Sequence, residues 1–335
     1  MTKTILLTGG AGYIGSHTYP ALAKAGYRVI ILDNFSNANH SVLDRLAQIT
    51  GAPVACEEGD VCDAAALERI FAAHQIDAVV HFAAKKSVAE SVAQPLTYIQ
   101  NNVTGLITLL QAMTKAGVFQ LVFSSSATVY GDTQTLPVPE DAPLNFTNPY
   151  GYTKLAGEQI LAQVATAEPR WTIGILRYFN PVGAHPSGLI GESPRDTPNN
   201  LMPYIAKVAV GELPHIRVYG NDYPTPDGTG VRDYIHVQDL AEGHVLSLQK
   251  LEATGQGHVV NLGTGRGYSV LEMIAAYSQA CGQTLPHQIE PRRPGDIAAN
   301  YADVSRAAEI LSFRTQYGLA DMCTSSWHWI KTSGS

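Results

Sequence analysis

Long apolar runs are absent from this sequence of 335 residues. A helix that crosses a bilayer needs about 20 predominantly apolar residues in a row, and the sequence contains no such run. The first apolar segment, in "MTKTILLTGG", ends in two glycines and not in a signal-peptide cleavage site. These features predict a cytoplasmic protein.

Cysteine pairs and metal-ligand spacings are absent as well. Cys56, Cys62, Cys281 and Cys323 are scattered without a CxxC pair, and the eleven histidines show no HExxH spacing. Disulfide frameworks and zinc sites are recognised by such spacings. We therefore expect no disulfide frame and no bound metal.

Positive charge is scarce, since 22 Lys and Arg against 29 Asp and Glu give a net charge of −7. This balance argues against a nucleic-acid-binding protein, which needs a dense basic surface. What the sequence does have is 45% hydrophobic and 15% charged residues, an ordinary globular composition. At this length we expect one large domain and a smaller one.

Short apolar runs alternate with helical patterns through the first half of the chain. The alternation predicts an α/β fold with a doubly wound, parallel, Rossmann-type sheet. We expect its strands to be buried on both faces. The predicted strands are Thr4–Gly9, Arg28–Asp33, Pro53–Glu58, Asp77–Phe82, Leu121–Ser125 and Thr172–Arg177.

Proline, glycine and asparagine crowd residues 180–200, which predicts an irregular loop and a domain boundary. We therefore assign residues 1–179 to a first domain and residues 180–335 to a smaller, mixed α/β domain. A return segment near 233–265 carries a predicted strand, His258–Gly263, that could rejoin the main sheet. Further helices are predicted at Leu201–Val210, Asp239–Gln249, Val270–Ala280 and Ser305–Leu311.

The stretch "TGGAGYIG" places Gly9, Gly12 and Gly15 three residues apart between a predicted strand and a helix. This spacing lets the backbone approach a pyrophosphate and points free helix amides at it. Asp33 follows at the end of the second strand, where a carboxylate binds the ribose of adenosine and repels the 2′-phosphate of NADP. The motif therefore predicts NAD as the cofactor.

Two other residues near this motif are less informative. Asp60 ends the third predicted strand and can either accept a hydrogen bond from adenine or cap the next helix. Pro20 lies inside the first predicted helix and is expected to kink it, because proline cannot donate the bond to Ser16. No function follows from Pro20.

In "PYGYTKLAGE", Lys154 lies four residues after Tyr150 and two after Tyr152. On a helix, Tyr150 and Lys154 share a face. An ammonium beside a phenol lowers the phenol pKa from about 10, so Tyr150 is the predicted base. The serine run in "VFSSSATVYG" ends a strand at the sheet edge where active sites lie, so a serine hydroxyl can help to hold a substrate alcohol.

These motifs resemble those of the extended short-chain dehydrogenase/reductase family, with its Gly-x-x-Gly-x-x-Gly turn and Tyr-x-x-x-Lys pair. Longer runs, such as "LRYFNPVGAHPSG" and "GNDYPTPDGTGVRDYIHVQDLA", resemble the UDP-hexose 4-epimerases of that family. The resemblance implies that Tyr150 takes the proton of the sugar 4-hydroxyl while hydride leaves C4 for tightly bound NAD. UDP-galactose and UDP-glucose would interconvert through a 4-keto sugar. Ser126 would bind the reacting oxygen, and Lys154 the nicotinamide ribose.

The resemblance also implies the remaining contacts and the assembly. The expected NAD contacts are Gly9, Gly12, Tyr13, Ile14, Gly15, Asp33, Asn34, Asp60, Val61, Phe82, Ala83, Lys86, Asn101, Tyr150, Lys154 and Phe179. The expected contacts of the UDP-sugar are Ser126, Asn180, Asn200, Leu201, Tyr219, Arg232, Arg293, Asp296 and Asn300. A homodimer is implied through Leu96–Ala116 and Tyr150–Ala165, although packing on the sheet explains the apolar run Leu106–Met113 equally well.

Asn300 stands where family members restricted to glucose and galactose carry a tyrosine under the sugar C2 substituent. The smaller asparagine predicts that UDP-GlcNAc and UDP-GalNAc also fit, unless neighbouring Tyr301 fills the space.

Three other functions compete with the epimerase prediction. A nucleotide-sugar 4,6-dehydratase would need an Asp-Glu pair where the sequence has Ala127 and Thr128. A net dehydrogenase, which exchanges its cofactor at every turnover, leaves no motif that would exclude it. A non-catalytic NAD-binding sensor usually lacks the catalytic pair, so Tyr150 and Lys154 argue against it.

Overall fold

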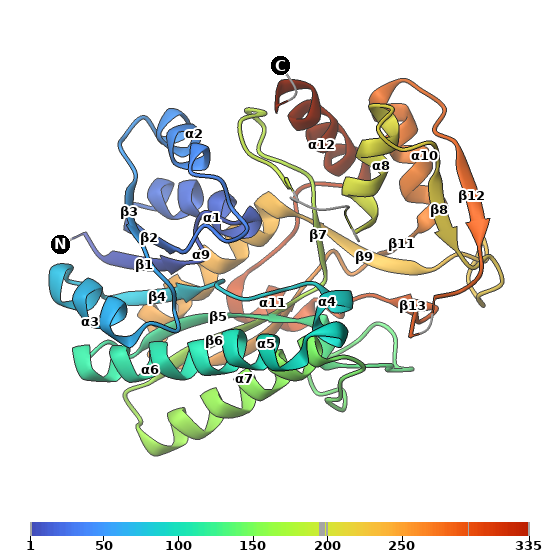
Figure 1. The fold of residues 1–335 in the computed structure, drawn as a ribbon. Helices are drawn as coiled ribbons and strands as arrows, with labels where there is room; N and C mark the ends of the chain where they lie inside the picture. The colour runs from blue at the N-terminus through green and yellow to red at the C-terminus, as the bar shows by residue number, and fades with distance from the viewer. Residues whose placement is uncertain (1, 194–197, 199, 294, 334–335) are drawn as a thin grey trace.

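The computed structural model describes residues 2–193, 198, 200–293 and 295–333. Its centre is a seven-stranded parallel sheet in the order β10-β6-β5-β4-β1-β2-β3 (Figure 1). The prediction of a doubly wound sheet is confirmed, and the strand predicted from His258 rejoins this sheet beside β6. The strands are β1 (Thr4–Thr8), β2 (Arg28–Asp33), β3 (Ala55–Glu58), β4 (Ala78–His81), β5 (Gln120–Ser126), β6 (Thr172–Tyr178) and β10 (His258–Leu262).

The central strands are buried, as their apolar runs predict. Every residue of β1 and β4 is buried. Burial was wrongly predicted for β3, whose residues are partly buried or exposed. The reason is its place at the edge of the sheet, where only β2 pairs with it.

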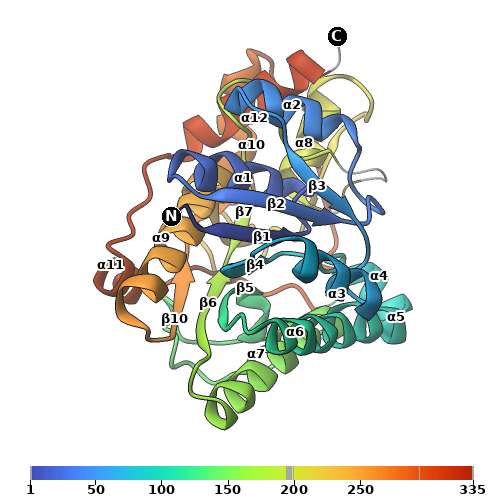
Figure 2. The same cartoon turned by 90° about the vertical axis from the view of Figure 1, so that its left-hand side faces the viewer.

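Helices cover both faces of the sheet, which Figure 2 shows from the side. Within β1, Ile5 and Leu7 pack in one apolar cluster and Leu6 packs in the other, because successive side chains of a strand point to opposite faces. The first face carries α1 (Tyr13–Lys24), α2 (Ser41–Thr50), α9 (Val237–Thr254) and α11 (Ser305–Leu311). The second face carries α3 (Ala64–Ala73), α6 (Gly105–Ala116) and α7 (Pro149–Ala167).

Local sequence signals fix the ends of these helices. The Asn148 side chain accepts a hydrogen bond from the Gly151 amide at 2.9 Å, and Pro149 takes the first helical position of α7. Helix α9 is longer than predicted because the His236 side chain caps its start and Gly255, at φ +62°, ends it. Helix α1 continues past Pro20, so this proline does not end the helix.

The cap of α3 corrects one interpretation. The Asp63 carboxylate accepts hydrogen bonds from the amides of Ala65 and Ala66, at 2.9 and 3.1 Å. Asp60 is therefore not the N-cap of this helix, and the capping alternative for Asp60 was wrong.

Short elements precede α6 and follow β5. Helices α4 (Val88–Ala93) and α5 (Pro95–Ile99) lead into a π-helical turn, η1 (Gln100–Thr104), which continues directly into α6. A short 3₁₀ turn, η2 (Ala127–Val129), follows β5.

The rest of the chain after β6 builds a smaller layer beside the carboxyl ends of the main strands (Figure 1). Its core joins α8, α10 and α12 to β8 and β9. A strand, β7, begins at Asn180, so the predicted irregular loop was wrong at its start; residues 194–197 and 199 of that stretch lie outside the described residues. The elements are β7 (Asn180–Val182), α8 (Leu201–Ala209), β8 (Ile216–Tyr219), β9 (Val231–His236), β11 (Gly267–Ser269), α10 (Val270–Cys281), β12 (His287–Glu290), β13 (Ala299–Asn300) and α12 (Leu319–Ser333).

Three properties of the described residues bear on the class of protein. No helix among them has the length and apolar character to cross a membrane. In the same part of the chain, no group of three or more His, Cys, Asp or Glu side chains could hold a metal ion. All four cysteines are free.

Candidate active site

A cleft of about 430 Å³ lies at the carboxyl ends of the central strands, against the smaller layer. It brings together every residue expected to contact NAD and the three expected catalytic residues, Ser126, Tyr150 and Lys154. Among the expected substrate contacts, Asn180, Asn200, Leu201, Arg232 and Arg293 also line it. Tyr219, Asp296 and Asn300 do not.

The glycine turn after β1 is shaped to admit a ligand. A Cβ at Gly9 would come within 2.7 Å of the Ala83 nitrogen, and one at Gly15 within 2.4 Å of the Gly9 oxygen. Gly12 differs, because a Cβ there would meet only the Gly9 oxygen, at 3.3 Å, and otherwise project into the cleft. No side chain caps the start of α1. The first amides of this helix can therefore bind a pyrophosphate.

Asp33 holds this turn in place. Its carboxylate accepts hydrogen bonds from the Ala11 amide at 3.0 Å and the Phe35 amide at 2.9 Å. Burial raises the pKa of Asp33, and hydrogen bonds from backbone amides oppose this rise. Since each carboxylate oxygen has two lone pairs, Asp33 can still accept bonds from ribose hydroxyls.

Asp60 lies two residues after the end of β3 and lines the same cleft as Asp33. It accepts hydrogen bonds from Asn34 Nδ2 at 2.7 Å and from the Cys62 amide at 2.8 Å. Partial burial acts to raise the pKa of Asp60, but the hydrogen bonds outweigh it and lower that pKa. The charged carboxylate faces the part of the cleft that Asp33 also lines.

The two tyrosines of α7 have different surroundings. Tyr150 is buried in the cleft wall, whereas Tyr152 is 39% exposed and packs edge-on against Phe146. Lys154 is buried, and its Nζ donates to the Ser124 carbonyl at 2.7 Å. Nζ lies 6.0 Å from the centre of the Tyr150 ring.

The pKa of Tyr150 differs from the sequence-based expectation. Burial raises it to about 12, and a hydrogen bond with Ser126 partly opposes this rise. The expected net lowering of the Tyr150 pKa is not seen, because burial has the larger effect. Burial lowers the pKa of Lys154 to about 8, and the nearby Glu158 carboxylate acts to raise it.

Ser126 stands at the junction of β5 and η2. Its extended backbone ends the strand, and its hydroxyl accepts a hydrogen bond from the Thr128 amide at 3.2 Å. The hydroxyl is therefore held in the wall of the cleft, within hydrogen-bond reach of Tyr150.

Arg293 is positioned by two residues that do not themselves line the cleft. Its Nε donates to Asp296 Oδ2 at 2.8 Å, and its guanidinium lies 4.6 Å from the centre of the Tyr219 ring. Asn300 lies opposite Arg232 in the register of β13 and β9. Its Oδ1 is buried and has no hydrogen-bond partner among the described residues.

Sequence reasoning missed several residues of the cleft, most notably Glu192 and Tyr178. Glu192 Oε1 accepts hydrogen bonds from Lys86 Nζ at 3.2 Å and Asn200 Nδ2 at 3.3 Å, and so links the two sides of the cleft. Burial raises the pKa of Tyr178. Glu192 follows a loop with no local motif. Tyr178 ends a strand at the active edge of the sheet, and this position could have indicated it.

The geometry fits a bound dinucleotide. An open glycine turn, an uncapped helix start and a buried acidic residue at the end of the second strand are the parts that dinucleotide recognition requires. A serine, a tyrosine and a lysine line the same cleft. Together, this fold and this site define an enzyme that acts with a dinucleotide cofactor.

Comparison with known proteins specifies the family. Residues 5–263 match the NAD dependent epimerase/dehydratase family. The chain is 54% identical to UDP-glucose 4-epimerase of Bacillus subtilis (strain 168), over 97% of this chain and 96% of that one. The chain belongs to the NAD dependent epimerase/dehydratase family.

Solved structures are similar over the full length. A UDP-glucose 4-epimerase from Stenotrophomonas maltophila, with bound NAD and formylated UDP-arabinopyranose, has a TM-score of 0.98 at 51% identity, with 99% of each chain covered. The enzyme from Bifidobacterium longum, in complex with NAD+ and UDP, has a TM-score of 0.95 at 53% identity, again with 99% of each chain covered.

Proposed function

We propose that the chain is an NAD-dependent UDP-glucose 4-epimerase, which interconverts UDP-galactose and UDP-glucose by transient oxidation at sugar C4. The observation that supports this function most strongly is that Ser126, Tyr150 and Lys154 line the same cleft as the glycine turn. The chain is also similar over its full length to UDP-glucose 4-epimerases.

Tyr150 is the general base of the proposed mechanism. Its phenolate removes the proton of the sugar 4-hydroxyl, and Ser126 holds the same oxygen by a hydrogen bond. The chemistry that NAD supplies when bound is reversible hydride transfer from and back to the sugar C4, with no net redox change. Once the 4-keto sugar has rotated in the cleft, hydride would return to the opposite face of C4, and Tyr150 returns the proton to the C4 oxygen.

The other proposed roles follow from position. Lys154 binds the nicotinamide ribose, and its ammonium stabilises the phenolate of Tyr150. Arg232 and Arg293 clamp the diphosphate, because a planar guanidinium matches two phosphate oxygens. Asp296 and Tyr219, which lie outside the cleft, orient the Arg293 guanidinium by a hydrogen bond and a cation–π contact. The proposed domains are an NAD-binding domain, residues 1–179 with a return segment near 233–265, and a sugar-binding domain, residues 180–335.

The direct test is conversion of UDP-galactose by purified protein without added NAD, with UDP-glucose measured by chromatography. Conversion supports an epimerase that keeps its own cofactor. Activity that requires added NAD and accumulates NADH indicates a net dehydrogenase. If neither UDP-galactose nor UDP-glucose is converted after NAD is supplied, the epimerase function is contradicted. The dehydratase and the NAD-binding sensor then become the favoured functions.

We also propose that the pocket accepts UDP-GlcNAc and UDP-GalNAc. The support is the small side chain of Asn300 beside Arg232. Asn300→Tyr should then lower turnover of UDP-GalNAc and leave turnover of UDP-galactose unchanged. A wild-type rate on UDP-GalNAc at background level would contradict the wider pocket.

We propose a homodimer formed through α6 and α7. Of the run Leu106–Met113, Leu106, Leu109, Leu110 and Met113 are buried against the sheet, whereas Ile107 is 38% exposed. Ile107 lies in a shallow, mainly apolar groove with Ile160 and Val164 of α7. Packing on the sheet therefore accounts for part of the run, and the exposed Ile107 is available to pack against a helix of the second subunit.

We also propose a cytoplasmic location, which cell fractionation would test.

A further inference from the structure

Glu158 is a buried carboxylate that the mechanism above does not use. It lies one helical turn after Lys154 in α7, with only 6% of its side chain exposed. Its Oε2 pairs with Arg177 Nη2 of β6 at 2.6 Å, and its Oε1 accepts a hydrogen bond from Ser125 Oγ at 2.5 Å. A buried charge is costly unless it is paired and hydrogen-bonded, and Glu158 is both.

The bond from Ser125 fixes the end of β5. Ser125 lies between Ser124, whose carbonyl accepts the Lys154 ammonium, and Ser126, which is held beside Tyr150. One carboxylate therefore ties the helix that carries Tyr150 and Lys154 to the strand that carries Ser126.

Glu158 also sets the charge around Lys154. Helix α7 presents Tyr150 and Glu158 to this ammonium, β5 presents the Phe123 ring and the Ser124 carbonyl, and β4 presents His81. Burial lowers the pKa of His81 to about 3, so this imidazole is neutral near pH 7. Glu158 supplies the negative charge that opposes the loss of the Lys154 proton.

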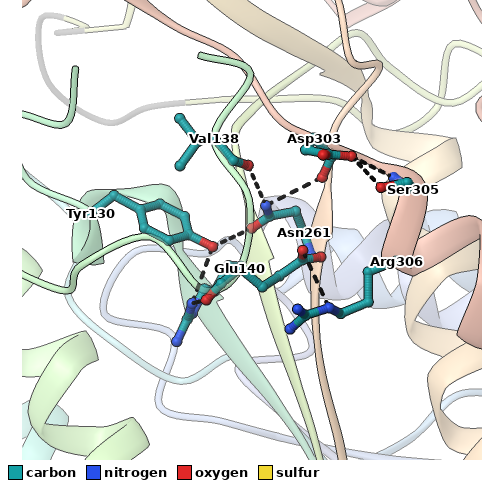
Figure 3. A network of polar contacts seen from close by, with 8 residues as sticks. Tyr130, Val138, Glu140, Asn261, Asp303, Ser305 and Arg306 are labelled. Carbon is teal, nitrogen blue, oxygen red and sulfur yellow. Dashed lines mark hydrogen bonds and ion pairs between the residues drawn. The ribbon is translucent and has the colours of Figure 1, made fainter. Parts of the chain in front are cut away.

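Arg177 is held from its other side, so that Glu158 stays in place. Its Nη1 donates to the Tyr130 hydroxyl at 3.1 Å and to the Glu140 carbonyl at 2.9 Å. Figure 3 shows how these contacts continue. The Tyr130 hydroxyl donates to Asn261 Oδ1 at 2.6 Å, and the backbone amide of Asn261 donates to Glu140 Oε1 at 2.7 Å. The network joins β5, β6 and β10.

We propose that Glu158 is a positioning residue for Ser126, Tyr150 and Lys154, which fixes the end of β5 against α7 and keeps Lys154 charged at the working pH. This inference rests on the roles proposed above for those three residues. Glu158 itself touches neither the cofactor nor the sugar in this proposal.

The test compares pH profiles of kcat for UDP-galactose epimerisation in wild type, Glu158→Gln and Glu158→Asp. In Glu158→Gln, Lys154 loses its proton at lower pH, so the alkaline fall in kcat should move down by roughly one pH unit. Glu158→Asp keeps the charge and should restore most of the wild-type profile. The matched control is Glu140→Gln, because Glu140 is equally buried in the same network but does not contact Lys154.

Two further measurements separate the possible outcomes. If Glu158→Gln does not fold, Glu158→Gln combined with Arg177→Met removes both charges together, and its profile should show the same shift. NMR titration of ¹⁵N-lysine-labelled protein, with Lys154 assigned through Lys154→Arg, reports the Lys154 proton even if epimerase activity is absent. A folded Glu158→Gln protein with the wild-type alkaline fall and the wild-type Lys154 titration overturns the inference.

Discussion

The carboxylate of Asp33 accepts a hydrogen bond from the Ala11 amide at 3.0 Å, so the residue that ends β2 also holds the glycine turn after β1. Its second oxygen holds the Phe35 amide at 2.9 Å. Asp33 therefore orders the glycine turn, and it also lines the cleft in which we propose that the ribose of NAD binds. Substitution should affect cofactor retention through both.

Asp33→Asn should weaken NAD binding by at least tenfold, because hydrogen bonds to a charged acceptor are worth about 1.5–3 kcal/mol each. It should also lower the preference for NAD over NADP, since the repulsion of a 2′-phosphate is lost. Fluorescence titration of the stripped protein with each dinucleotide measures both effects. Asp44→Asn, which changes an exposed carboxylate of α2, is the control. Unchanged NAD affinity in Asp33→Asn would contradict this role.

Tyr150→Phe should lower kcat by roughly 10²–10⁴-fold, the usual contribution of a general base. NAD should remain bound, because removal of one hydroxyl leaves the glycine turn and Asp33 intact. The matched control is Tyr152→Phe, two residues along the same helix but 39% exposed, and this variant should keep wild-type turnover. A large loss of kcat in Tyr152→Phe, with little in Tyr150→Phe, would reverse the assignment of the base.

The sequence predicted the central sheet well because its inner strands are short apolar runs, the pattern that a parallel strand buried on both faces produces. Strand β9, "VRDYIH", mixes polar and apolar residues without a continuous apolar run and lies in a small mixed sheet, and neither β9 nor β8 was predicted. Local motifs placed Gly12 and Tyr150 in the cleft. Glu192 lines the cleft from the segment that follows β7, and no local pattern indicates this.

The pKa of Tyr150 was mispredicted for a related reason. The spacing of Tyr150 and Lys154 indicates a shared helix face, and both residues are indeed on it. Spacing does not indicate burial, which raises the pKa of Tyr150 to about 12, nor the Ser124 carbonyl that accepts a hydrogen bond from the Lys154 ammonium. Both the burial of Tyr150 and the partner of Lys154 depend on the neighbouring strand, so they follow only from the fold.

Ile107→Lys should turn the proposed homodimer into a monomer. Ile107 lies in the apolar groove between α6 and α7, and burial of a lysine against a partner helix would leave its charge unpaired. Analytical ultracentrifugation over a range of protein concentrations measures the change. Ile289→Lys is the control, because Ile289 of β12 is similarly exposed, at 41%, on another face of the chain. If both variants sediment as the wild type does, the proposed interface is excluded.

Acid should destabilise the protein through its buried histidines. Burial lowers the pKa of His17 and His81 to about 3 and that of His236, His244 and His258 to about 4. Since the unfolded chain binds protons below its histidine pKa of about 6.5 and the folded chain does not, the unfolded state gains protons first. The contribution of these neutral, buried histidines to the free energy of unfolding is fully present above pH 6.5 and is lost as the pH falls toward 4.

His258 offers the cleanest test, because it lies in β10 and its Nε2 is hydrogen-bonded to Ser247. A fall in pKa from 6.5 to about 4 corresponds to on the order of 3 kcal/mol. Between pH 7 and 4, the free energy of unfolding should therefore decrease less in His258→Gln than in the wild type, as urea titrations would measure. His287→Gln, at an exposed site, should follow the wild-type curve. Parallel curves for wild type and His258→Gln would show that this histidine takes up no proton on unfolding, and would exclude the linkage.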